Sequence, residues 1–228
     1  TMHLAGARSV ATNADGTRLY VASRISDSLS VFDLSIDNNG NLVTILRATK
    51  RNGVDGVDGL DQALHLVVLP SGTPGIENIY VAAANSHAVS SFGYDANSGE
   101  LTQLGTLFNG QGGVTGLADV EHLVASPGGD HVYALSGSSA SVSLLDRNAN
   151  GSLSWRLSYT DAQLLAGVSS GSFDAAGKYF YLTASTANRI VVLPRKNDPG
   201  EGSGIFGTLS LSGNGVSSIG QAQASAQA

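Results

Sequence analysis

The chain has 228 residues, of which 42% are hydrophobic and 13% are charged, so it can bury a core but carries about half of the usual share of charged residues. Acidic residues outnumber basic ones by 18 to 12, which gives a formal net charge of −6. We expect no nucleic-acid partner, because no cluster of Lys and Arg could follow a phosphate backbone. We also expect no membrane insertion, because no apolar run approaches about 18 residues.

The sequence contains 29 glycines and no cysteine. The lack of cysteine excludes a disulfide framework and a thiolate metal site. Cysteine-free, lysine-poor chains rich in Ser, Asn and Gly are common among bacterial surface and secreted proteins, so we expect a secreted or cell-surface bacterial protein. The first residues, Thr1-Met2-His3-Leu4, do not form a signal peptide, so we expect either a removed one or a chain excised from a larger protein.

Four segments in chain order share one pattern, a glycine turn followed by a short strand with a central tyrosine. The turn glycines are Gly16, Gly72, Gly129 and Gly177. The marker tyrosines, spaced by 60, 53 and 48 residues, are Tyr20, Tyr80, Tyr133 and Tyr181. A polar loop and an alternating strand follow each tyrosine, and in the first three repeats an Asx/Gly turn then leads into a fourth strand. We expect sheet-on-sheet packing to bury all four tyrosines.

Four short strands per period form one antiparallel sheet, and radial stacking of such sheets is typical of a β-propeller. The sequence therefore predicts an all-β propeller of four four-stranded antiparallel blades, with helix nearly absent. The blades are expected at about residues 5–54, 55–112, 113–166 and 167–215. Residues 216–228 are expected to be the start of the next linker or a tail. Because no closing strand shared by the termini is recognisable, we prefer a segment of a larger propeller over a compact four-bladed ring.

The strings Leu19-Tyr-Val-Ala-Ser23, Ile79-Tyr-Val-Ala-Ala83 and Val132-Tyr-Ala-Leu-Ser136 resemble the YVTN-type β-propeller repeat. The turn Ser126-Pro-Gly-Gly129 is similar to the Ser-Pro-Asp-Gly turn of that family. The resemblance covers roughly residues 5 to 210. It implies a relationship to lactonase-like seven-bladed propellers, surface-layer proteins, or propeller modules inside large bacterial surface proteins.

Candidate binding residues come from aligning the repeats on their turn glycines. The alignment gives equivalent positions at the starts of the inner strands to Ser9, His65, His122 and Ser170. Arg8 and Glu121 directly precede two of them. Because the inner strands of a propeller line its channel, the candidate ligand-binding residues at the channel mouth are Arg8, His65, Glu121 and His122.

These side chains could bind a metal or polarise the carbonyl of a lactone. The alternative is a set of polar residues that line a water-filled channel. We assign no catalytic residue.

No cofactor is expected, with calcium or another divalent metal as the alternative. The segment Asp146–Gly151 satisfies the opening of a calcium loop, but Leu157 stands where the loop requires a bidentate glutamate. A second acidic segment repeats an aspartate between glycines, at Asp55, Asp58 and Asp61. We favour a turn for the first segment and a solvated linker for the second.

The leading hypothesis is a non-enzymatic scaffold or recognition module of a bacterial extracellular or cell-surface protein, which binds a protein or carbohydrate ligand at the propeller mouth. The alternative is a lactonase-like, metal-assisted hydrolase with its site at the propeller axis. If the end blades expose unpaired faces, we expect self-association or completion by another chain segment.

Overall fold

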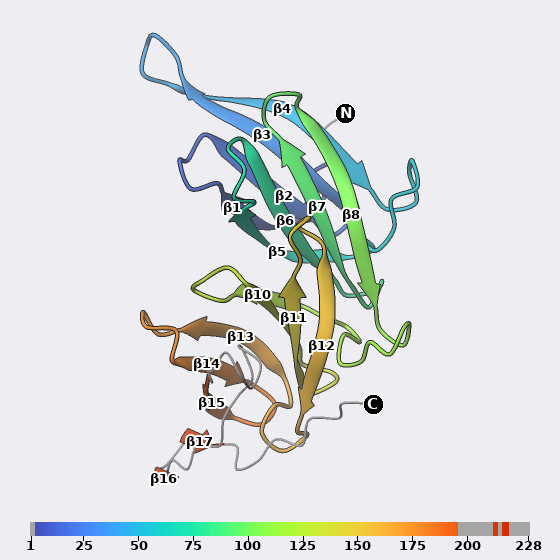
Figure 1. Ribbon diagram of the computed structural model, residues 1–228, viewed down its shortest axis with the longest axis vertical. Coiled ribbons are helices and arrows are strands. Elements are labelled where there is room, and N and C mark those ends of the chain that lie inside the picture. The colour runs from blue at the N-terminus through green and yellow to red at the C-terminus, as the bar shows by residue number, and fades with distance from the viewer. Residues whose placement is uncertain (1–2, 196–211, 214–215, 219–228) are drawn as a thin grey trace. The chain divides into compact units, whose positions relative to one another are not determined.

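The computed structural model describes residues 3–195, 212–213 and 216–218, and every regular element among them is a β-strand (Figure 1). The first sheet contains β1 (Ala7–Thr12), β2 (Arg18–Ser23), β3 (Ser28–Ile36) and β4 (Leu42–Arg51). The second contains β5 (Ala63–Pro70), β6 (Ile76–Ala83), β7 (Ala88–Asp95) and β8 (Glu100–Phe108). No helix in this part of the chain is long and apolar enough to cross a membrane.

The third sheet contains β9 (His122–Ala125), β10 (His131–Ser136), β11 (Ser141–Arg147) and β12 (Leu153–Thr160). The fourth begins with β13 (Val168–Phe173), β14 (Tyr179–Ala184) and β15 (Arg189–Pro194). At its edge, β17 (Val216–Ser218) pairs in parallel with β15, and β16 (Ser212–Gly213) pairs with β17.

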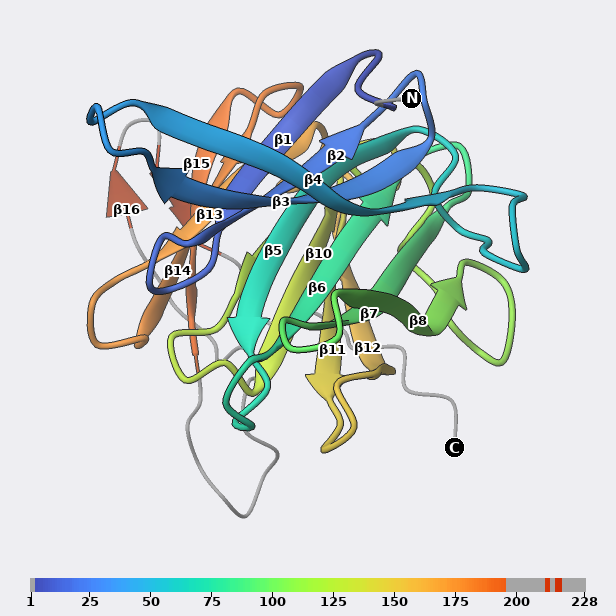
Figure 2. The same cartoon turned by 90° about the horizontal axis from the view of Figure 1, so that it is seen from above.

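The strand order in the first three sheets follows the chain, so each sheet is a four-stranded antiparallel meander of the predicted kind. Both views show β5, β6 and β7 side by side in the second sheet (Figure 1, Figure 2). The prediction of an all-β fold built from antiparallel sheets is confirmed, but the fourth sheet differs from the predicted four-stranded blade, because its three antiparallel strands are extended by the parallel strand β17. The chain forms two compact units: residues up to Thr106 with Asn148–Leu153, and Leu107–Arg147 with the residues from Ser154 onward.

The marker tyrosines occupy one register position in all four sheets. Each lies opposite the residue two positions after the strand-start residue that the alignment identified, and these partners are Ala11, Val67, Val124 and Ser172. Because side chains alternate between the two sides of a strand, this register places every marker tyrosine on the same side of its sheet. We call that side the tyrosine face and the other side the reverse face.

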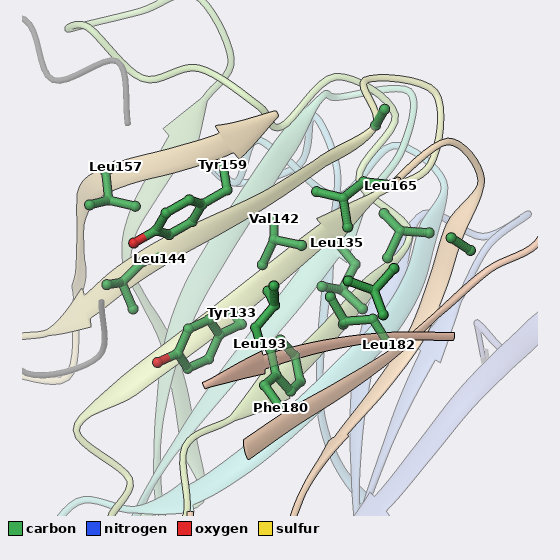
Figure 3. Close-up of a cluster of buried hydrophobic side chains, with 14 residues drawn as sticks. Tyr133, Leu135, Val142, Leu144, Leu157, Tyr159, Leu165, Phe180, Leu182 and Leu193 are labelled. Carbon is green, nitrogen blue, oxygen red and sulfur yellow. The ribbon is translucent and has the colours of Figure 1, made fainter. Parts of the chain in front are cut away.

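Each unit has a core in which the tyrosine face of one sheet packs on the reverse face of the next. In the first unit, Tyr20 and Val31 from the first sheet pack with Leu66, Ile79 and Phe92 from the second. The second unit repeats this arrangement between the third and fourth sheets (Figure 3). The labelled residues of that core include Tyr133, Leu135, Leu144, Phe180, Leu182 and Leu193.

The expectation that all four marker tyrosines are buried is wrong for one of them. Tyr20, Tyr80 and Tyr133 have no exposed surface, whereas 42% of Tyr181 is exposed. The difference follows from the packing order, because the residues that the fourth sheet contributes to the core lie on its reverse face. Burial of a marker tyrosine requires a following sheet and is not a property of the strand alone.

Hydroxyl pairs bind two of the linkers to the sheets that follow them. Ser90 and Thr106 lie 3.1 Å apart, and the Ser90 hydroxyl donates to the Gly59 carbonyl at 2.9 Å. In the second unit, Ser143 and Ser158 lie 2.7 Å apart, and Ser143 reaches the carbonyl of Gly116 at 3.1 Å. A Cβ at Gly116 would lie 2.6 Å from the Ser158 hydroxyl, so this approach requires glycine.

Candidate functional site

Three of the four inner strands, β1, β5 and β13, begin at equivalent β-bulges. The register shifts between Ala7 and Ser9 in β1 and between Ala63 and His65 in β5, which makes Arg8 and Leu64 the extra residues. The same shift occurs in β13 between Val168 and Ser170. Bulges redirect side chains and are common beside functional sites. The register therefore agrees with the alignment that made Ser9, His65, His122 and Ser170 equivalent.

In the first unit, Arg8 and His65 lie on neighbouring inner strands. The Ser9 hydroxyl accepts a hydrogen bond from the backbone N–H of Leu66 at 3.2 Å, and this bond joins β1 to β5 beside both residues. Arg8 is exposed and His65 is half-buried. The first unit thus offers a guanidinium, a hydroxyl and an imidazole at the starts of two adjacent strands.

In the second unit, Glu121 and His122 are consecutive residues at the start of β9. The backbone N–H of Glu121 donates to the carbonyl of Leu135 at 3.0 Å, while its side chain is exposed. Burial lowers the pKa of His122 below its ordinary value. The His122 imidazole is therefore neutral near pH 7 and able to accept a proton.

Among the described residues, no group of three or more His, Asp or Glu side chains is arranged to hold a metal ion. Three of the four aspartates considered for calcium accept the protein's own donors. Asp146 pairs with Arg156 Nε at 2.8 Å and with His131 Nε2 at 3.4 Å, and Asp58 accepts the backbone N–H of Gly59 at 2.7 Å. Asp61 accepts the Asn85 amide at 3.3 Å. These contacts support turn and linker roles for both acidic segments.

A buried carboxylate that the sequence analysis did not identify joins the first two sheets. Glu77, at the start of β6, is only 9% exposed. Its Oε2 accepts the Tyr20 hydroxyl at 2.5 Å, and its Oε1 accepts Arg18 Nη1 at 2.8 Å and Asn13 Nδ2 at 3.0 Å. Burial and the bond to Glu77 raise the pKa of Tyr20, so its phenol stays protonated. No sequence signal marks Glu77, because the repeat carries different residues at the aligned positions.

The Glu77 cluster (Asn13, Arg18, Tyr20 and Glu77) borders an open cavity of about 460 Å³. The walls are the turn between β1 and β2 and the turn between β5 and β6, with Asp15, Val68 and Thr73 among the lining residues. This cavity lies at the opposite ends of β1 and β5 from Arg8 and His65. All three donors around Glu77 are directed at its carboxylate, so the cluster holds two sheets together rather than presenting a free acid to a ligand.

No protein-family model and no curated protein matches the sequence. Solved structures match the fold. A proposed 6-phosphogluconolactonase from Bacteroides uniformis shares 20% identity with a TM-score of 0.65, and the periplasmic gluconolactonase PpgL of Pseudomonas aeruginosa shares 18% with a TM-score of 0.68. Each match covers 88% of this chain and 52% of the other.

A Lactobacillus plantarum protein matches 95% of this chain and 57% of its own length, with 18% identity and a TM-score of 0.70. The chain thus spans about half of the length of these proteins. The likeness shows that its sheets are arranged as in lactonase-like β-propellers.

Proposed function

We propose that this chain is a lactonase-like propeller of the YVTN type that binds a sugar lactone, or the acid formed from it, at the starts of its inner strands. The observation that carries the proposal is the repeated placement of a half-buried imidazole beside a solvent-exposed charged residue, Arg8 with His65 and Glu121 with His122. Two of the structurally similar proteins bear gluconolactonase names, which supports the choice of ligand by fold analogy.

The chemistry of lactone opening suits these groups. Water adds to the ring carbonyl, a base takes a proton from that water, and the ring C–O bond then breaks as the alkoxide is protonated. In the second unit, a neutral imidazole such as that of His122 can act as the base. In the first unit, a cationic donor such as Arg8 can bind a carbonyl oxygen or a carboxylate. His65 is the second candidate base because it occupies the equivalent position in β5.

The test is the hydrolysis of glucono-1,5-lactone and of its 6-phosphate, followed by acid release in a pH-stat. We expect a rate above that of buffer alone and a loss of at least about tenfold in His65→Asn or His122→Asn, since general-base catalysis typically contributes more than this. Glu100→Gln is the matched control, because Glu100 is exposed on β8 and bonded to Thr102. A wild-type rate equal to that of buffer would contradict hydrolysis by this chain.

A second candidate is a non-enzymatic scaffold or recognition module of an extracellular or cell-surface protein, with a protein or carbohydrate as its ligand. The observation that favours it is the structural use of the polar linker groups. Asn52 accepts the backbone N–H of Leu60 at 2.9 Å, and Asp27 accepts that of Gln62 at 2.9 Å. Calorimetry separates the candidates: binding of gluconate without turnover of the lactone supports recognition alone.

A further inference from the structure

Two sheet faces expose large apolar side chains whose repeat equivalents are buried. On the tyrosine face of the fourth sheet, Tyr181 is 42% exposed and Ile190 is 48% exposed. On the reverse face of the first sheet, Val10, Ile36 and Leu42 are 63%, 66% and 63% exposed. Large apolar side chains gathered on one sheet face mark an interaction surface.

The reverse face of the first sheet corresponds residue by residue to a face that already packs on a sheet. Val10 lies opposite Val21 as Leu66 lies opposite Val81, and Leu66 is 2% exposed in the core of the first unit. Leu42 at the start of β4 corresponds to Leu101, the second residue of β8, and Leu101 is 3% exposed. The reverse face of the first sheet therefore has the pattern that receives a tyrosine face.

The tyrosine face of the fourth sheet has the complementary pattern. Tyr181 occupies the register of Tyr20 and Tyr133, each of which packs against the reverse face of the following sheet. The hydroxyls reach across as well: Tyr20 donates to Glu77 of the second sheet, and Tyr80 donates to the carbonyl of Gly151 at 2.9 Å. Tyr181 is the member of this series whose ring faces solvent.

We propose that a second copy of this chain covers these faces, with the tyrosine face of the fourth sheet of one copy packed on the reverse face of the first sheet of the other. Each copy supplies both halves of a contact that the chain already makes twice within itself, between the first and second sheets and between the third and fourth. Such a contact is heterologous, so it closes a ring of copies or extends a chain of them. The proposal is independent of the proposed function.

The experiment uses light scattering after size-exclusion chromatography, over a range of protein concentrations, with single substitutions on each face. Wild-type protein is expected to be dimeric or larger, whereas Tyr181→Arg and Val10→Arg are each expected to be monomeric. Ile25→Arg is the matched control, because Ile25 is 70% exposed but lies in the turn between β2 and β3 rather than on either face. It should assemble like the wild type.

Mixing the two variants distinguishes this contact from nonspecific hydrophobic association. Tyr181→Arg keeps an intact reverse face and Val10→Arg keeps an intact tyrosine face, so the mixture should form a one-to-one complex that neither variant forms alone. If circular dichroism shows that Tyr181→Arg or Val10→Arg does not fold, Ile190→Arg replaces the first and Leu42→Arg replaces the second. A monomeric wild type at every concentration, assembly that survives both substitutions, or a mixture without the complex would overturn the proposal.

Discussion

Replacing Glu77 by alanine should destabilise the first unit more than any other single truncation of a charged side chain there. The substitution removes the acceptor of three hydrogen bonds, from Tyr20, Arg18 and Asn13. Tyr20 is fully buried and Asn13 is 7% exposed, so water cannot readily replace the lost carboxylate at these two donors. The Arg18 side chain is 18% exposed and can be partly rehydrated.

Each buried donor left without a partner costs about 1–3 kcal/mol, and breaking a buried ion pair costs about 3–5 kcal/mol in total. Because the three donors share one carboxylate, these figures overlap, and we expect Glu77→Ala to lower the free energy of unfolding by about 3–5 kcal/mol. Tyr20→Phe, which removes one donor and leaves the ion pair, should cost about 1–2 kcal/mol. The two changes together should cost less than their sum.

The assay is urea unfolding followed by far-UV circular dichroism, with Glu100→Ala as the control. Glu100 is exposed on the same sheet and should change the stability by less than about 0.5 kcal/mol. Because the chain has two compact units, their transitions are fitted separately where they do not coincide. A Glu77→Ala protein within about 0.5 kcal/mol of the wild type, or strict additivity with Tyr20→Phe, would refute the role of this carboxylate in joining the sheets.

Three further predictions concern ionisation and close packing. Burial raises the pKa of Tyr133 to about 12, so the tyrosine ionises at lower pH in the unfolded state than in the folded state. The free energy of unfolding should therefore fall as the pH rises from about 10 to 12, and it should fall less steeply in Tyr133→Phe. Urea midpoints measured across this pH range test the prediction. Burial lowers the pKa of His131 despite the attraction of Asp146, so as the pH falls the unfolded state binds a proton before the folded state does. The free energy of unfolding should therefore fall as the pH drops below 6.5. His131→Asn should weaken this pH dependence when unfolding is followed in an acid titration. Gly116→Ala should lower the midpoint of thermal unfolding more than Gly110→Ala. Both glycines have a positive φ, but of the two only Gly116 has atoms within 4 Å of an added Cβ. Equal losses in the two variants would contradict this packing argument.

The repeat made most of the fold predictable. The marker tyrosines and turn glycines recur at fixed offsets, and the observed register reproduces the alignment that they define, including the equivalence of His65 and His122. The repeat predicts the register because strand alternation and tight turns are local properties of the sequence. Local patterns likewise predict a linker for Asp55–Asp61 and a turn for Asp146–Gly151, and the carboxylates of Asp58, Asp61 and Asp146 accept the protein's own donors.

What the sequence could not predict depends on contacts between sheets. Glu77 is important because Tyr20, Arg18 and Asn13 converge on it from another sheet, and no aligned position of the repeat carries this combination. The exposure of Tyr181 has the same origin, since its strand pattern is that of the buried tyrosines and only its surroundings differ. Single-repeat patterns contain no information about which sheet comes next.

The measurement that tests the proposed function most directly is a titration of the chain with gluconate, followed by the imidazole C–H resonances of its five histidines in NMR. Single His→Asn variants assign the resonances. We predict saturable shifts for His65 and His122, with His131 unaffected because it is buried against Asp146. Shifts absent from both His65 and His122 at millimolar gluconate would contradict ligand binding at the starts of the inner strands.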